Sequence, residues 1–285
     1  MRIAFPLTLV LAVGCAKPAV EAPAELAELS RFLFLHALDD EPAELEAAVE
    51  NLIPQILTDD FDAEPRDRAV ALPVLKGRFL GDLSIPEGVD AEKQVPRGLS
   101  GVSTSSIDEL REAITIPNRV CLDSDTTVWA MREFTTDAGC WDSGACDRLE
   151  AVQETRKENP IAKVWYDLFI SARTLELIDD EEDTVTQAIV TRGWIEEQFV
   201  GDSQGDTWDQ LFYVEVLVEN GANESLRWTG YWSSIDLALI GDDAYGILVA
   251  DGLAQSAQWT DDYVSTGGPS ADCELDINAE KPDRE

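Results

Sequence analysis

The sequence predicts an α+β protein with an N-terminal helical hairpin, a disulfide-braced middle segment and a C-terminal antiparallel β-meander that forms a sheet or a barrel. Three observations support this fold class. Apolar residues recur at helical spacing near the N-terminus, four cysteines lie in the body of the chain, and stretches rich in β-branched and aromatic residues follow residue 161 at regular intervals.

Two amphipathic helices are predicted over residues 24–38 and 42–57. In the first, Leu26, Leu29 and Leu33 recur every three or four positions, which places them on one helical face. The short acidic link between the two segments ends in proline, a residue that suits the first turn of a helix. The pair is therefore expected to form a helical hairpin that packs on the rest of the protein.

The middle of the chain carries weaker signals. A helix is expected over residues 106–114, because Glu109 three residues after Ser106 completes a capping box. Another helical stretch is expected over residues 147–156.

Four cysteines follow residue 100, and an even number suits two disulfides. Disulfides persist in the oxidising compartments that exported proteins reach, and export is what the first fifteen residues predict. Three pairings are open. Cys140 and Cys146 flank a short glycine-containing loop and form the easiest local pair, and Cys121 would then join Cys273. A zinc site is the alternative, but neither the cysteine spacing nor the single histidine, His36, favours it. No metal ligand, cofactor or catalytic residue is assigned.

Strands are expected in five segments separated by polar turns: residues 161–178, 185–200, 208–219, 225–240 and 245–259. In the fourth segment Leu226, Trp228 and Trp232 share one face, whereas Tyr231 and Ile235 share the other. Apolar groups on both faces indicate a sheet that is covered on both sides, or a barrel wall.

The first fifteen residues predict an address outside the cytoplasm. One arginine precedes a short apolar run, which has the pattern of a secretory signal and is too short to span a bilayer. The segment from Leu11 to Cys15 resembles the lipobox of bacterial lipoproteins, with Ala12 at the position where leucine is usual. The resemblance implies cleavage before Cys15, a lipid on its thiol and, with Ala16 next, an outer-membrane destination. The membrane is then a partner through this anchor.

The chain is accordingly divided into five parts. They are a signal peptide (1–14), a lipidated flexible tether (15–23), a mainly helical and irregular region (24–160), an antiparallel β region (161–264) and an acidic tail (265–285).

Charge excludes one class of function. The formal net charge is −36, and such a surface repels nucleic acid, whose binding depends on cationic contacts with phosphate.

Catalytic patterns are weak. His36 lies among apolar residues of the first helix, and the segment 98–101 lacks the second glycine of a nucleophile elbow. A hydrolase would need two converging carboxylates, for which the candidates are Asp167, Glu196, Asp209 and Glu215 beside Trp194 or Trp208. The acidic turns 179–183 and 202–209 offer oxygen atoms for calcium but do not reproduce an EF-hand, and solvated turns explain them more simply.

The sequence therefore favours a surface lipoprotein with a structural, adhesive or binding role. A carrier of a lipid or other apolar ligand is the first alternative, and a carboxylate-dependent hydrolase is the second. An enclosed apolar cavity lined by tryptophan and leucine would favour the carrier, two converging carboxylates the hydrolase, and a solid core the structural role.

Overall fold

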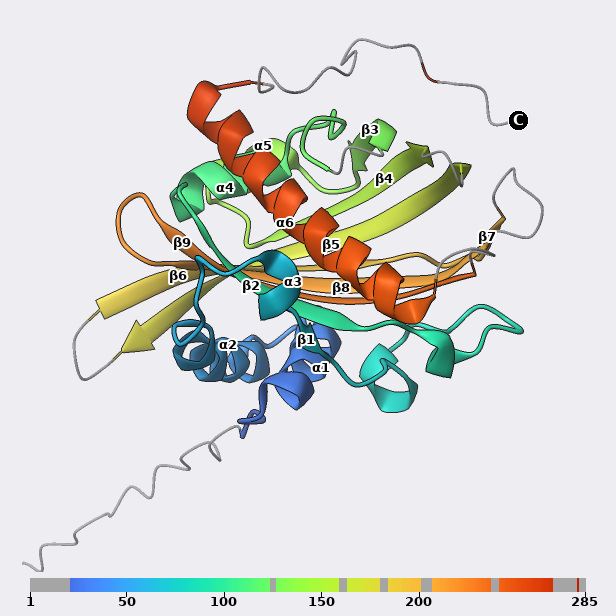
Figure 1. Ribbon diagram of the computed structural model, residues 1–285. Coiled ribbons are helices and arrows are strands. Elements are labelled where there is room, and N and C mark those ends of the chain that lie inside the picture. Colours follow the sequence, from blue (N-terminus) through green and yellow to red (C-terminus); the bar gives the residue numbers. More distant parts are fainter. Residues whose placement is uncertain are drawn as a thin grey trace, which may run out of the picture.

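The computed structural model describes residues 21–123, 127–158, 163–179, 184–200, 207–236, 241–268 and residue 281. Within these residues a nine-stranded antiparallel sheet forms the centre of the molecule (Figure 1). The strand order is β1-β2-β9-β8-β6-β5-β4-β3, with β7 paired to β8 beside this path. The strands are β1 (Val70–Ala71), β2 (Arg97–Ser103), β3 (Thr127–Phe134), β4 (Arg148–Glu158), β5 (Lys163–Asp179), β6 (Thr184–Trp194), β7 (Phe199–Val200), β8 (Thr207–Glu219) and β9 (Ser225–Asp236).

The fold class predicted from the sequence is wrong. There is no separate meander after residue 161, because β1 to β4 precede that point and belong to the same sheet as β5 to β9. The N-terminal strand β2 pairs with β9 over seven residues, from Arg97 opposite Tyr231 to Ser103 opposite Ser225. The pairing of distant segments, which local periodicity does not encode, creates this single sheet.

Helices flank the two faces of this sheet. They are α1 (Leu26–His36), α2 (Ala43–Ile56), α3 (Pro65–Arg68), α4 (Ile107–Ile114), α5 (Ala138–Asp142) and α6 (Asp242–Thr266), with two 3-10 turns, η1 (Gly77–Leu80) and η2 (Ala91–Lys93). Figure 1 shows α1 and α2 on one side of the sheet and α6 crossing the other side. None of the described helices is both long enough and apolar enough to cross a membrane.

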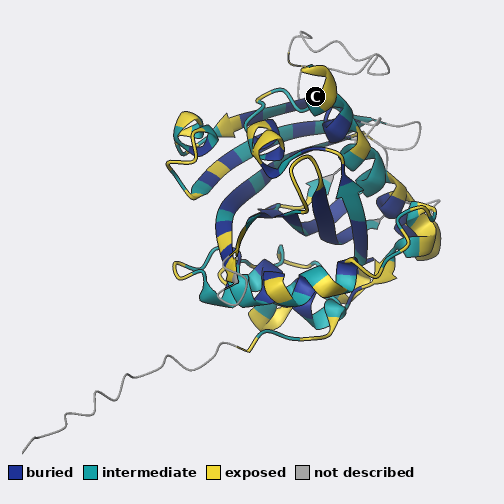
Figure 2. Ribbon diagram, turned by 90° about the vertical axis from the view of Figure 1, so that its left-hand side faces the viewer, coloured by how far each residue is buried: buried dark blue, intermediate teal, exposed yellow. Residues whose placement is uncertain are grey.

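Alternation along β8 explains why both faces are covered. Phe212, Val214 and Val216 point toward α1 and α2 and are fully buried in the largest core cluster. The intervening residues Tyr213 and Glu215 point to the opposite face, toward α6. Figure 2 shows the buried strand residues between the helical layers. The predicted cover on both faces of the sheet is confirmed.

The last predicted strand, residues 245–259, is instead part of helix α6. Its buried residues are spaced four apart, as in Tyr245 and Val249, and that spacing makes one helical face. Asp242 and Asp243 lie in its first turn, where negative charge is favourable, and Gly267 ends it in the left-handed conformation. The β-branched and aromatic residues of this segment had indicated a strand.

Two further local predictions have opposite outcomes. The expected helix at 147–156 is wrong, because this segment is β4, in which Leu149, Ala151 and Gln153 are buried at every second position. The capped helix at 106–114 is confirmed as α4: Ser106 accepts from the Glu109 backbone, and the Glu109 carboxylate accepts from the Ser106 backbone. Helices also occupy both predicted N-terminal ranges, as α1 and α2.

Candidate functional site

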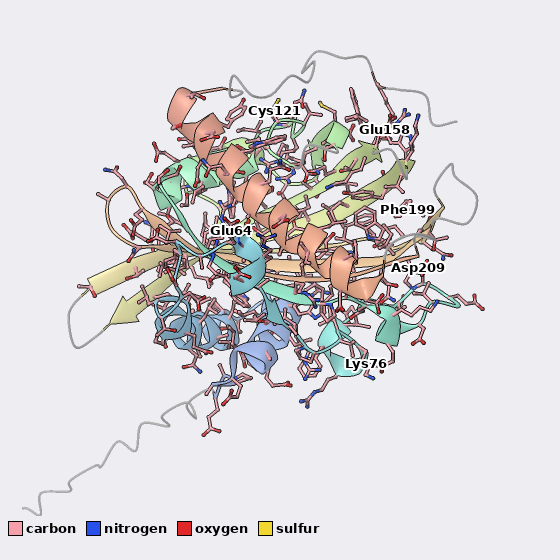
Figure 3. All side chains as sticks on the ribbon, viewed as in Figure 1. Glu64, Lys76, Cys121, Glu158, Phe199 and Asp209 are labelled. Atoms are coloured by element: carbon pink, nitrogen blue, oxygen red, sulfur yellow. A yellow bond between two sulfur atoms is a disulfide. The ribbon has the colours of Figure 1, made fainter. Side chains whose placement is uncertain are left out.

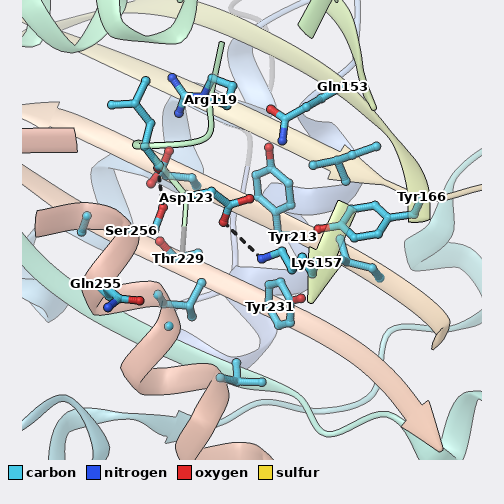
Figure 4. A pocket seen from close by; sticks show the side chains of 18 of the residues that line it. Arg119, Asp123, Gln153, Lys157, Tyr166, Tyr213, Thr229, Tyr231, Gln255 and Ser256 are labelled. Carbon is cyan, nitrogen blue, oxygen red and sulfur yellow. Dashed lines mark hydrogen bonds and ion pairs between the residues drawn. The ribbon is translucent and has the colours of Figure 1, made fainter. Parts of the chain in front are cut away.

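A cavity of about 740 Å³ lies between α6 and the face of the sheet that α1 and α2 leave open (Figure 4). Its floor comes from alternate residues of the central strands, such as Tyr213 on β8 and Tyr231 on β9. Its cover comes from α6, which contributes residues from Tyr245 to Ala257. One face of the sheet is filled by α1 and α2, whereas on the other face α4 and α5 cover a part and α6 spans the rest, which leaves the cavity beneath α6.

Part of the lining is apolar and aromatic. Tyr166 and Trp208 lie with their ring centroids 5.2 Å apart, and Tyr166 also approaches Phe199. The remaining apolar lining residues include Val164, Leu168, Leu211, Ile235, Leu248, Val249 and Leu253. This part of the cavity matches the apolar character of small-molecule sites.

The other part of the lining is charged. Arg132 of β3 donates to the Ile114 carbonyl at 2.6 Å and, from two nitrogen atoms, to the Gln153 side chain of β4. Arg119 donates to the Ala113 carbonyl at 2.6 Å. The carbonyl groups near the end of α4 thus hold two guanidinium groups at the cavity wall.

Asp123 and Glu215, the two acidic residues in this part of the lining, each form an ion pair. Lys157 Nζ lies 3.2 Å from Asp123 Oδ1, the contact drawn in Figure 4. Arg227 Nε lies 3.7 Å from Glu215 Oε1. Both acids therefore have a basic partner within the cavity.

Burial shifts the pKa values of the lining groups. Desolvation lowers the pKa of Arg132 to about 9, and repulsion from the nearby Arg119 contributes to the same shift. Desolvation also raises the pKa of Tyr213 and of Tyr245 to about 12 and that of Tyr166 and Tyr231 well above the usual value. Four tyrosines thus present neutral hydroxyl groups to the cavity at ordinary pH.

Three polar atoms of the lining lack hydrogen-bond partners among the described residues: Thr191 Oγ1, Trp208 Nε1 and Arg227 Nε. All three side chains are at least nine-tenths buried. A buried polar atom without a partner costs free energy, so these atoms are positions where a bound molecule or water would be stabilised.

Helix α6 is fixed over the cavity by hydrogen bonds along its length. Near its start the Tyr245 hydroxyl lies 2.6 Å from Ser233 Oγ of β9. In its middle Ser256 Oγ donates to the Leu122 carbonyl at 3.0 Å, and near its end Asp261 accepts from Ser103 Oγ of β2.

Of the predicted disulfide residues, Cys121, Cys140 and Cys146 are not among those that line the cavity. Cys140 and Cys146 form a disulfide across the end of α5, with 5.3 Å between their Cα atoms. Cys121, labelled in Figure 3, is also disulfide-bonded, and its predicted partner Cys273 lies outside the described residues. The predicted lipidation site Cys15 also lies outside them.

The four acids proposed for a hydrolase are not brought together. Only Glu215 lines the cavity, whereas Glu196 is exposed and Asp167 alternates with the cavity residues of β5. Asp209 accepts a hydrogen bond from Gln198 at 2.5 Å near one end of β8 (Figure 3).

The other sequence candidates also lie elsewhere. His36 contacts Asp39 at 2.6 Å on α1, and segment 98–101 is an internal part of β2. Most of the two acidic turns considered for calcium lies outside the described residues. Among the residues the structure describes, no group of three or more His, Cys, Asp or Glu is placed to hold a metal.

Sequence reasoning missed most residues of the cavity, including Arg119, Arg132 and Lys157. One signal was present in β9, where Arg227 and Thr229 occur within a strand otherwise rich in large apolar groups. Polar residues on a strand that is covered on both faces indicate an internal polar site, because burial of a polar group without a hydrogen-bond partner costs free energy.

No protein-family model and no curated protein matches this chain. Similar solved structures include a START superfamily protein from Mycobacterium smegmatis, with 9% identity, a TM-score of 0.37 and coverage of 60% of this chain and 97% of that one. A conserved protein from Geobacillus kaustophilus has 13% identity and a TM-score of 0.36 over 60% of this chain and 95% of that one. The lipid transfer and protein localization domain of human StarD13 has 14% identity and a TM-score of 0.33 over 58% and 76% of the two chains. These TM-scores all lie below 0.5, so the likeness is too distant to indicate a function.

Proposed function

We propose that this protein binds and carries an apolar or amphipathic small molecule in the cavity beneath α6. The volume of about 740 Å³ is the observation that carries the proposal. Protein interiors are close-packed and contain few voids larger than a water molecule, whereas ligand sites measure roughly 300–1,000 Å³. A partly enclosed cavity of this size beneath α6 has the dimensions of such a ligand site.

The lining supports a carrier over the structural or adhesive role that the sequence favoured. A structural role would require a solid core, whereas the face of the sheet beneath α6 has a cavity beside the buried cluster around Trp141 and Leu217. The hydrolase alternative loses support because its candidate acids are dispersed. The apolar contacts of Trp208, Leu211 and Val249 suit a hydrocarbon group, which gains about 25 cal/mol for each Å² removed from water.

We also propose that the carrier is held at a membrane surface by lipid on Cys15. The support is the lipobox-like segment ending at this residue. An anchored carrier would collect or deliver its ligand next to the bilayer in which such molecules dissolve.

A pair of α6 substitutions tests the carrier. Ala257 and Ala254 are both partly buried, but only Ala257 is among the residues lining the cavity. Ala257→Phe should fill part of the cavity and weaken binding of the neutral probe N-phenyl-1-naphthylamine by roughly tenfold, about 1.4 kcal/mol. Ala254→Phe should leave that affinity unchanged.

Native mass spectrometry of the purified full chain provides the second readout. A co-purifying small molecule that is lost on denaturation is expected. A protein that carries no such molecule and takes up no probe would contradict the proposal.

A further inference from the structure

The charge distribution of the cavity is opposite to that of the protein as a whole. The chain carries 57 acidic and only 21 basic residues. Among the described residues that line the cavity, four are basic, namely Arg119, Arg132, Lys157 and Arg227. Three are acidic, and one of these, Asp251, is exposed on α6. A very acidic protein thus concentrates positive charge at an internal site.

Two of these cations have no anionic partner among the described residues. Asp123 pairs with Lys157 and Glu215 pairs with Arg227, which uses both acids of the cavity interior. Arg119 and Arg132 make hydrogen bonds to carbonyl and amide oxygen atoms instead, and no carboxylate of the described part of the chain forms an ion pair with either. A guanidinium held only by neutral acceptors keeps its positive charge available to a bound anion.

The two guanidinium groups also repel each other. Arg119 lies close enough to Arg132 to lower the pKa of Arg132, and Arg227 lowers the pKa of Arg119 in the same way. An anion between them would relieve this repulsion and replace part of the hydration lost on burial. Arg227 Nε and Thr191 Oγ1 lack hydrogen-bond partners among the described residues, and both side chains, each more than nine-tenths buried, line the same cavity.

We propose that the cavity selects an amphiphile with an anionic headgroup, which contacts Arg119 and Arg132 while its hydrocarbon part lies along the apolar lining. This inference rests on the proposed carrier function and names the class of its ligand. Guanidinium groups bind carboxylate and phosphate oxygen atoms in a paired geometry. A fatty acid and a lysophospholipid phosphate are two sources of this same headgroup chemistry.

Matched ligand pairs test the selection on the delipidated full chain. Each competitor displaces N-phenyl-1-naphthylamine, and the pairs are palmitate against hexadecanol and lysophosphatidate against monopalmitoylglycerol. Each anion is expected to bind at least roughly tenfold more tightly than its neutral partner, as a charged hydrogen bond provides. Tighter binding in the first pair alone identifies a carboxylate, and in the second pair alone a phosphate.

Variants locate the headgroup. Arg119→Gln and Arg132→Gln should each reduce the preference for the anion to less than about threefold, with hexadecanol affinity kept. Retained hexadecanol binding shows that the variant is folded. Substitution should disturb folding less at Arg119, which is half-buried, than at Arg132, which is buried. Arg66→Gln removes an exposed arginine of α3 and should leave the preference intact.

The outcomes separate the two proposals. Equal affinity for anionic and neutral partners overturns the charge selection while the carrier function stands. If none of the four amphiphiles displaces the probe, or the probe itself does not bind, the carrier function fails with it.

Discussion

Gly193 of β6 lies directly opposite Tyr213 of β8 in the sheet. A Cβ atom on Gly193 would come within 1.9 Å of the Tyr213 ring, so the ring occupies the space that a side chain would need. The absence of a side chain lets Tyr213 lie across the neighbouring strand as part of the cavity floor. Gly193 therefore makes room for an aromatic ring that lines the cavity.

Gly193→Ala should displace the Tyr213 ring into the cavity. We expect a loss of about 1–3 kcal/mol in the free energy of unfolding, as for other overpacked sites, together with weaker binding of N-phenyl-1-naphthylamine. Denaturant unfolding and probe titration measure the two effects.

Gly101→Ala is the matched control in β2. No atom lies within 4 Å of its Cβ position, so the free energy of unfolding should stay the same or rise slightly. Equal behaviour of the two variants would contradict the role assigned to Gly193.

Helix α6 is expected to control access to the cavity that it covers. Its polar contacts with β2, β9 and the loop before β3 are few and separated along 25 residues. Leu248 is 55% exposed although it lines the cavity, so the apolar surface continues to the outside along this helix. A helix fixed at a few points can move away locally with loss of few hydrogen bonds.

Tyr245→Phe tests this control by α6. The change removes the hydroxyl contact with the buried Ser233 and should lower the free energy of unfolding by about 0.5–1.5 kcal/mol. Because the start of α6 is then less firmly held, probe release in stopped-flow displacement should be faster. Tyr263→Phe, farther along α6 and not among the lining residues, should leave the release rate unchanged; a change of equal size there would refute the idea.

At the scale of the whole molecule, surface charge and internal charge serve different roles. The formal net charge of −36 predicts an outer surface that repels nucleic acid. The field of the exposed acids is screened within about 8 Å at physiological ionic strength, whereas the buried arginines act at contact distance. Recognition of the proposed ligand is therefore expected to depend on the cavity and not on the outer surface.

The proposed lipid anchor at Cys15 would determine where the whole molecule is held. Cys15→Ser should abolish incorporation of labelled lipid and release the protein from the membrane fraction, because Cys15 is the only cysteine within residues 1–23. Probe binding by the released protein should equal that of the parent protein. Metabolic labelling with a fatty acid and fractionation provide the measurement, and undiminished labelling would rule out the anchor.

Local signals in the sequence determined several elements. The capping box of α4, the apolar spacing in α1 and α2, and the two covered faces of β9 follow from periodicity and short-range hydrogen bonding, which adjacent residues encode. The easiest disulfide, Cys140–Cys146, likewise follows from a short loop whose ends meet.

The tertiary structure alone decided the site. Arg119 comes from the segment before β3, Arg132 from β3, Gln153 from β4, Arg227 from β9 and the cover from α6. Segments more than a hundred residues apart meet only because β2 pairs with β9 and α6 returns across the sheet, and single-sequence periodicity contains no information on those pairings. Composition, charge and short-range elements are encoded by neighbouring residues, whereas the cavity and its arginine pair arise from long-range packing.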